Sequence, residues 1–177
     1  LLGVNLKSFY SVFIVFLTSF LSLVGTMGFM GWLYFITGYD IYNFTILGTS
    51  IPIILLTIAN SDGVHIVARF RKEARKLRDV SSAVATTLKS LRRPIFLTSL
   101  TTAIAFLSMI SSPIPHMVGY GTTVAFGVFL AWILSTTLLP SLIIVRKWNL
   151  NASKFKKDSF IEILVEKLSQ KVVRNPK

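Results

Sequence analysis

Four long runs of apolar residues dominate the sequence. They occupy about residues 9–36, 44–68, 95–111 and 117–145. A helix needs about 20 residues to cross the ~30 Å hydrocarbon core of a bilayer, and each run is close to or beyond that length. The pattern therefore predicts an all-α protein, a polytopic transmembrane helix bundle of four spans within residues 1–148, with cytoplasmic amphipathic helices in addition.

The longest polar connector, residues 69–93, lies between the second and third spans. Its pattern predicts a basic helical hairpin outside the membrane. Ser81 or Ser82 is a suitable N-cap for a second short helix over residues 83–91, which would lie on the membrane surface. The basic face of this helix favours water and lipid headgroups, and contact with a regulatory partner is the alternative.

Prolines and glycines add detail to the spans. Pro94 would open the third span, because proline is favoured at the start of a helix. Pro52 lies inside the second apolar run and would kink that helix. Gly25, Gly28 and Gly31 recur every three residues in the first span, and this spacing predicts close approach of a neighbouring helix.

The last part of the chain, residues 149–177, has an amphipathic pattern. Its apolar residues at helical spacing are Phe160, Ile161, Leu164, Val165, Leu168 and Val172. Ser159 followed by Glu162 fits a capping box. We expect a linker helix along the cytoplasmic membrane surface. The chain also lacks an initiator Met and a signal peptide, and we expect it to be an internal piece of a longer polypeptide.

Composition agrees with a membrane protein. Hydrophobic residues make up 53% of the chain and charged residues only 15%, against about a quarter in soluble domains. The mean hydropathy is +0.67. The absence of cysteine excludes disulfides and thiolate metal sites, and we expect neither a metal nor a cofactor.

The positive charges are distributed asymmetrically. The net charge is +12, and the 19 Lys and Arg residues fall before the first span, between the second and third, and after the fourth. The connectors 38–43 and 111–117 contain none. By the positive-inside rule both ends and the 69–93 segment are cytoplasmic, which predicts a multi-pass protein of the cytoplasmic (inner) membrane. Charges that flank spans do not form a nucleic-acid surface, so no nucleic acid is expected.

Asp62 is the acidic residue within a predicted span. It precedes Arg69 by seven residues, about 10 Å along a helix, so it lies inside the inner leaflet. An Asp at that depth costs about 2.5–3.5 kcal/mol on insertion scales, and proton relays are a common use of such residues. His65 shares its helical face, and Asn60 and Ser61 offer further polar contacts. The alternatives are a structural acid bonded to hydroxyls of the third span and a histidine bonded to backbone.

Thr98, Thr101 and Thr102 supply hydroxyls in the third span. We predict that they support the relay as hydrogen-bonding partners of Asp62. The alternative is that they bond back to their own helix or join neighbouring helices.

Three segments together resemble the resistance–nodulation–division (RND) superfamily: "IPIILLTIANSDGVHIVARFRKE", "LRRPIFLTSLTTAIAFLSM" and "GYGTTVAFGVFLAWILSTTLLPSLI". The most similar branch is that of MMPL and hydrophobe/amphiphile exporters, which is related to sterol-sensing domains. That branch shows Asp-Asp-Gly-Ile-His followed by Arg-Tyr. Here Asp62-Gly63-Val64-His65 precedes Arg69-Phe70, and Ser61 stands where the first Asp is found.

The resemblance implies that the four spans are the third to sixth helices of a six-helix half. The first two helices and a porter domain would precede the chain, and a second half would follow it. It implies export of lipids or other hydrophobic or amphiphilic molecules, driven by the proton-motive force. Asp62 would carry the proton, and Thr98 matches a threonine that contacts the relay in some members. With Ser61 in place of an acid, this half either couples protons through one carboxylate or is silent.

Two other readings share the fold. One is a non-transporting sterol- or lipid-sensing bundle, and the other is a SecD/SecF-like accessory of protein export. An enzyme is not expected, because the sequence has no His-Glu-x-x-His or Gly-x-Ser-x-Gly motif and no second acid in a span. The expected partners are the lipid bilayer, a hydrophobic substrate, protons, the rest of the polypeptide and, in a homo-oligomer, further copies.

Overall fold

The computed structural model describes residues 9–146 and residue 148, and this part of the chain is helical without strands. Its long helices are α2 (Phe9–Thr37), α3 (Ile51–Leu77), α4 (Val80–Leu107) and α5 (Pro115–Val145). Short 3₁₀ turns join them: η1 (Asp40–Tyr42), η2 (Ile46–Ser50) and η3 (Ser108–Ser111). All four long helices are apolar enough to span a membrane, which confirms the predicted fold class. The predicted linker helix 149–177, with Ser159 and Glu162, lies outside the described residues.

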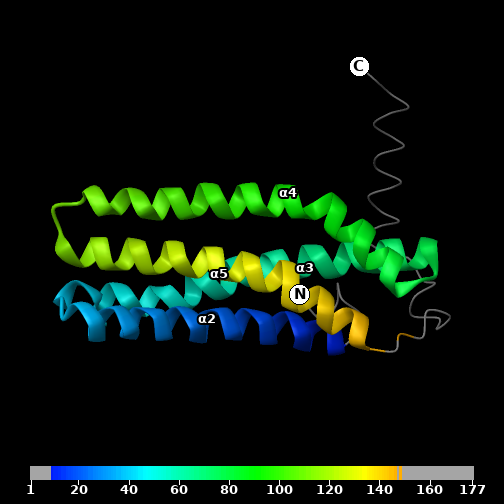
Figure 1. The fold of residues 1–177 in the computed structure, drawn as a ribbon, viewed down its shortest axis with the longest axis horizontal. Helices are drawn as coiled ribbons and strands as arrows, with labels where there is room; N and C mark the ends of the chain where they lie inside the picture. Colours follow the sequence, from blue (N-terminus) through cyan, green and yellow to red (C-terminus); the bar gives the residue numbers. More distant parts are fainter. Residues whose placement is uncertain (1–8, 147, 149–177) are drawn as a thin grey trace, which may run out of the picture.

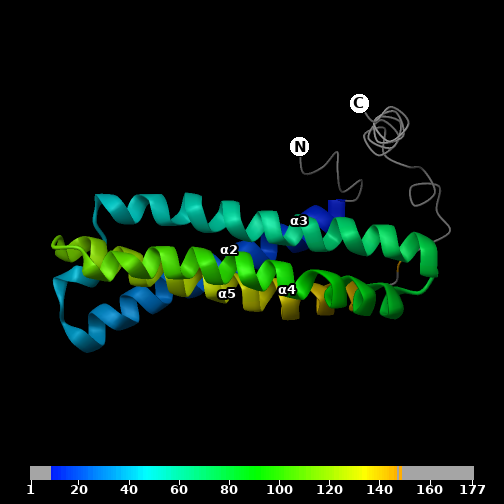
Figure 2. The same cartoon turned by 90° about the horizontal axis from the view of Figure 1, so that it is seen from above.

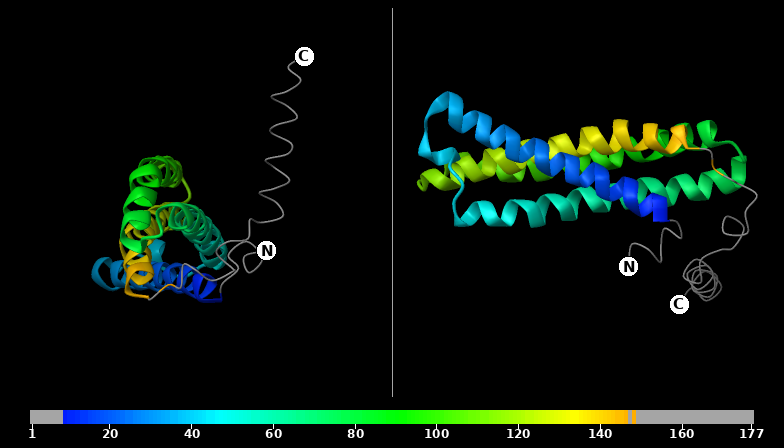
Figure 3. Two further views of the ribbon diagram at one scale, coloured as in Figure 1. Left: turned by 90° about the vertical axis from the view of Figure 1, so that its right-hand side faces the viewer. Right: turned by 90° about the horizontal axis from the view of Figure 1, so that it is seen from below.

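The four helices run side by side as an elongated bundle (Figure 1). The connectors without Lys or Arg lie together at one end, and the basic α3–α4 turn lies at the other end (Figure 2). The start of α2 and the end of α5 lie at the basic end as well. Seen along the bundle, α5 and α3 form its centre and contact every other long helix, with α2 and α4 on either side (Figure 3).

The basic segment differs from the prediction. The surface helix expected over 83–91 and the third span are one continuous helix, α4, so the predicted boundary at Pro94 is wrong. Pro94 lies inside α4, where it cannot donate a hydrogen bond to the Ser90 carbonyl, and the ribbon bends in this region (Figure 1). The first turns of α4 are held in the bundle because Ala83 and Thr87 are buried.

The predicted caps and kinks also change. Neither Ser81 nor Ser82 is the N-cap of α4; that residue is Asp79, whose carboxylate accepts the Ser82 N–H at 2.8 Å. Pro52 does not kink a span, because it lies in the first turn of α3, where its missing N–H leaves no helical bond unmade. Before it, the Ile51 N–H donates to the Gly48 carbonyl.

Helix α2 turns small hydroxyl residues inward and large phenyl rings outward. The buried hydroxyl residues are Ser11, Thr18, Ser19, Ser22 and Thr26, and the exposed rings include Phe13, Phe16 and Phe20. The hydroxyls of Thr18, Ser22 and Thr26 donate to carbonyls one turn earlier on α2. Small residues allow close helix approach in a membrane, where lipid rather than water covers the outward side chains.

The predicted glycine contact is confirmed at one position of three. A methyl group on Gly25 would lie 2.7 Å from Leu130 Cδ2 of α5. Gly28 and Gly31 have nothing within 4 Å of the corresponding point among the described residues. Elsewhere, the core consists of two apolar clusters along the bundle: Ile14, Val15, Ile66, Val67, Phe70 and Leu139 are members of the first, and Met30, Ile51, Leu55, Val124 and Val128 form the second.

Gly119 of α5 permits the closest approach between helix and connector. A methyl group there would overlap the backbone carbonyl of Ile41 in η1, which cannot move aside as a side chain could. We expect Gly119→Ala to lower the free energy of unfolding by about 1–3 kcal/mol. Gly28→Ala is the matched control and should raise it by about 0.5–1 kcal/mol, because alanine is the better helix former. Reversible unfolding in mixed micelles measures both, and equal effects of the two substitutions would contradict this account.

Asp79 provides a pH-dependent test of the α4 N-cap. Side-chain and backbone hydrogen bonds from Ser82 hold the pKa of Asp79 below its ordinary value. Because folding lowers this pKa, its stabilising contribution is present at neutral pH and is lost as the pH falls through the lowered pKa. We expect Asp79→Ala to lower the melting temperature at neutral pH but not in acid, while Asp79→Asn keeps an acceptor and loses less. Thermal unfolding at neutral and at acidic pH tests this. A lower melting temperature of Asp79→Ala that persists in acid would argue against the cap.

Candidate functional site

A cavity of about 540 Å³ lies between α3 and α4. Along α3 it extends from Thr57 to His65, about 12 Å, and along α4 from Leu91 to Thr102. Its walls are formed by Thr57, Ile58, Ser61, Asp62, His65, Leu91, Pro94, Ile95, Thr98, Ser99 and Thr102. Most of the lining is apolar, and a few polar groups interrupt it.

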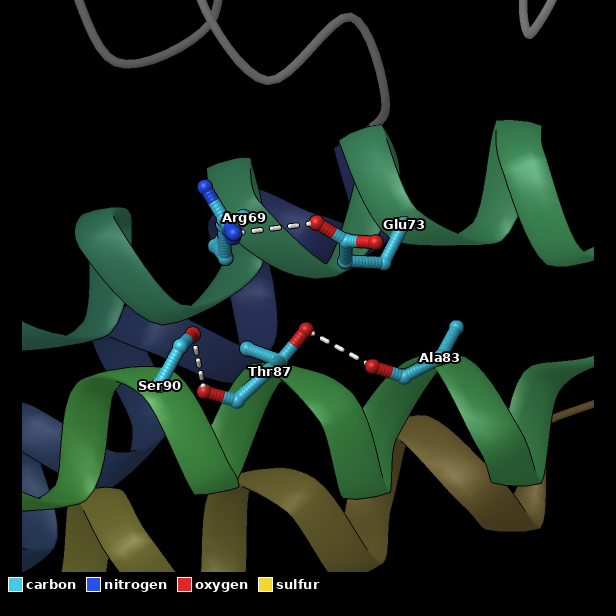
Figure 4. A network of polar contacts seen from close by, with 5 residues as sticks. All are labelled: Arg69, Glu73, Ala83, Thr87 and Ser90. Carbon is cyan, nitrogen blue, oxygen red and sulfur yellow. Dashed lines mark hydrogen bonds and ion pairs between the residues drawn. The ribbon is translucent and has the colours of Figure 1, made fainter.

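Asp62 is the acid in this cavity. Its side chain lies on α3 and the residue is only 9% exposed. The Oδ2 atom is buried and has no hydrogen-bond partner among the described residues. Arg69, the next basic residue on α3, pairs instead with Glu73 at 3.1 Å (Figure 4). Asp62 is therefore a buried carboxyl in contact with a cavity, at the position the sequence predicts.

Ser99 is the cavity residue that sequence analysis missed. It is 3% exposed, and its Oγ atom has no hydrogen-bond partner among the described residues. The signal for it is helical phase, since Ile95, Ser99 and Ala103 recur every four residues and form the buried stripe of α4. Asp62 and Ser99 thus line one cavity from two helices, and each has a buried oxygen without a partner among the described residues.

The three predicted threonines separate into two groups. Thr98 and Thr102 line the cavity that also contains Asp62. Their Oγ1 atoms donate to the carbonyls of Ile95 at 2.9 Å and Thr98 at 2.8 Å. Thr101 does not line it, and its hydroxyl bonds to the carbonyls of Leu97 and Thr98. Similar return bonds occur at Thr87 and Ser90 nearer the start of α4 (Figure 4).

The polar neighbours of Asp62 on α3 also differ in direction. Ser61 and His65 line the cavity beside Asp62. Asn60 does not, because its Oδ1 accepts the Ser19 hydroxyl of α2 at 2.9 Å. Residues two positions apart in a helix are rotated by about 200° around its axis. Because Asn60 is bonded to α2, Asp62 lies on the opposite side of α3. Asn60 therefore fixes the rotation of α3 instead of contributing to the cavity.

Aromatic residues close the basic end of the bundle. The Tyr10 hydroxyl donates to the Leu142 carbonyl at 3.1 Å, and Trp148 Nε1 donates to the Ile143 carbonyl at 2.7 Å. These bonds satisfy two of the last carbonyls of α5, which have no helical donor. The Arg146 guanidinium lies 4.1 Å from the centre of the Tyr10 ring, where its charge also favours the helix C-terminus.

Gly63 packs α3 directly behind Asp62. A methyl group on Gly63 would lie 2.8 Å from Val15 Cγ1 and 3.4 Å from Leu139 Cδ1. We expect Gly63→Ala to reduce the free energy of unfolding by about 1–3 kcal/mol through overpacking. In the double variant with Val15→Ala the inserted methyl group finds space, so the combined loss should be smaller than the sum of the single losses. Unfolding free energies of the four proteins test this, and additive losses would mean that the two sites are not in contact.

Comparison with known proteins places this arrangement in a family. A Methanocaldococcus jannaschii protein, MJ1562, whose name describes it as a membrane protein, is 28% identical to the chain over 94 residues. That match covers 53% of this chain and 24% of the M. jannaschii protein, so the chain matches about a quarter of that relative's length. No solved structure matches the chain. The profile of the MMPL family matches residues 1–177, and the chain therefore belongs to the MMPL family.

Proposed function

We propose that this chain is the membrane-spanning part of a transporter that uses the proton-motive force to export lipids or other hydrophobic or amphiphilic molecules. Asp62 is the proton carrier in this proposal. Ser61, His65, Thr98 and Thr102 line the space through which a proton reaches it. The basic end of the bundle faces the cytoplasm, in the cytoplasmic membrane, with both ends of the chain on that side.

One observation carries the proposal: a buried carboxyl, whose Oδ2 has no partner among the described residues, lines a cavity between two apolar helices. A structural acid would be bonded to hydroxyls of α4, yet Thr98 and Thr102 donate to their own helix. An uncompensated charge in a membrane is costly, so the carboxyl favours a state in which a cation neutralises it. Binding and release of a proton can therefore be linked to a change in helix packing.

The remaining parts of such a transporter lie outside this chain. We propose that helices and a porter domain precede it, that a second half follows it, and that the assembly is a homo-oligomer. The substrate route is then shared with these parts, and the four helices here supply coupling energy. Protons, the bilayer and the hydrophobic substrate are the partners.

A second candidate function, a lipid-sensing bundle without transport, has its own supporting observation. A second cavity of about 510 Å³ lies between α2, α4 and α5. Its lining is largely apolar and includes Phe29, Phe126 and Phe129. A volume of this size suits a small hydrophobic ligand. This function predicts ligand binding that needs no proton gradient and tolerates loss of the Asp62 carboxylate. A SecD/SecF-like export role has no comparable support.

Replacement of Asp62 tests the transport proposal. The full-length protein containing this chain is expressed, and export of the hydrophobic dye Nile red is measured in everted membrane vesicles energised by a pH gradient. We expect Asp62→Asn to reduce gradient-driven dye movement to the level of vesicles without the protein, because the amide cannot exchange a proton.

Asp40→Asn is the matched control. It makes the same chemical change at an exposed acid in η1, far from the cavity, and should transport at the wild-type rate. Unchanged transport in Asp62→Asn would exclude Asp62 as the carrier. Dye binding without gradient-driven movement, in both wild-type and variant, would favour the lipid-sensing function.

A further inference from the structure

We propose that the cavity between α3 and α4 binds Na⁺, with oxygens of Asp62, Ser99, Thr98 and Thr102 as its ligands. This inference deepens the proposed function, on which it rests, by naming a second cation that competes with the proton for the same carboxylate. The cavity is bounded by two helices, and both contribute oxygen atoms to its wall.

The threonine hydroxyls of the cavity wall donate their protons to their own helices. A hydroxyl has one proton and two acceptor lone pairs. The proton of Thr98 is donated to Ile95, that of Thr102 to Thr98, and that of Thr57 to Ile53 at 2.7 Å. What remains available on each hydroxyl is its acceptor capacity. Such hydroxyls cannot pass a proton along the wall without first breaking their bonds to the helix, but they can serve as ligands to a cation as they stand.

Two residues of the cavity wall have a buried oxygen that lacks a hydrogen-bond partner within the described part of the chain. Asp62 Oδ2 and Ser99 Oγ each have no hydrogen-bond partner among the described residues, although both residues are at least nine-tenths buried. A buried polar atom left without a partner costs about 1–3 kcal/mol. Both residues line the same cavity from different helices, so one ligand bound there would give partners to both oxygens. Carboxylate and hydroxyl oxygens are hard ligands, which hard metal cations prefer.

The charge of the cavity selects a monovalent cation. Asp62 is the carboxylate among its lining residues, and that lining contains no lysine or arginine within the described part of the chain. His65 is the other titratable residue of the wall, on the same helix as Asp62, and α4 contributes none. One bound Na⁺ gives a neutral pair with the carboxylate. A divalent ion would leave an excess positive charge in an apolar surrounding, which is unfavourable.

Direct binding of radioactive sodium to the purified full-length protein tests the site. Binding is measured at fixed pH, with choline chloride maintaining ionic strength, for wild-type, Asp62→Asn, Ser99→Ala, Thr102→Val and Thr101→Val. We expect saturable binding to wild-type and none to Asp62→Asn. Loss of one oxygen in Ser99→Ala or Thr102→Val should weaken binding about tenfold. Thr101→Val removes a neighbouring hydroxyl of α4 that does not line the cavity, and it should bind as wild-type does.

Absence of saturable sodium binding to wild-type overturns the inference, as does equal binding to Asp62→Asn. If Asp62→Asn does not fold, the comparison of Ser99→Ala and Thr102→Val with Thr101→Val still decides, and equal affinities among the three overturn it. The proposed function fails separately. Proton-driven dye export that needs Asp62, without sodium binding, rejects only the sodium site, whereas sodium binding without gradient-driven export rejects the transport function.

Discussion

The hydrocarbon core of a bilayer offers no hydrogen bonds, and the rest of this structure depends on that constraint. Each polar group within the four helices must find its partner inside the protein. Serine and threonine hydroxyls therefore bond to carbonyls of their own helix, as at Thr18, Ser22 and Thr26. Where the α5 backbone ends, the side chains of Tyr10 and Trp148 supply the missing donors. The bundle is thus built from helices that satisfy themselves and pack through small residues.

Against this background, unpartnered groups identify the unusual places in the bundle. Ser11, Thr123 and Trp132 also have a buried polar atom that finds no partner in the described part of the chain, yet none of them lines the cavity between α3 and α4. Each is neutral, so the cost of leaving it unpartnered is limited to one lost hydrogen bond. Asp62 differs because its side chain can carry a full charge, and a buried charge is far more costly. Space beside such a group allows a cation to come and go.

Much of this organisation can be predicted from the sequence because it depends on hydropathy and charge averaged over long segments. Hydropathy over some 20 residues locates the spans, and the distribution of Lys and Arg matches the two ends of the bundle. A helix boundary predicted from Pro94 alone was wrong, because burial of Ala83 and Thr87 keeps α4 continuous through the proline. At Pro52 the sequence could not show that α3 begins there after a 3₁₀ turn.

The composition of the site depended on helix rotation, which a single sequence does not specify. Asn60 and Asp62 are close in sequence, but the contact of Asn60 with Ser19 on α2 places them on opposite sides of α3. In the same way, Thr101 points away from the cavity while Ser99 lines it. Contacts with neighbouring helices select these directions. A buried acid could therefore be predicted at Asp62, while the residues of α4 that line the same cavity could be found only from the structure.

Ser61 bears on how a single carboxylate can act. A second acid beside Asp62 would require a second positive charge, and the described lining of the cavity has no lysine or arginine to provide it. With Ser61 at that position, one cation is enough to neutralise the cavity, and its departure leaves one negative charge. Under the proposed mechanism this change from neutral to charged is the quantity that helix packing must accommodate. The serine then fits a half that couples an ion through one acid. One cation balances the charge of the cavity, and no charged residue from another helix is needed.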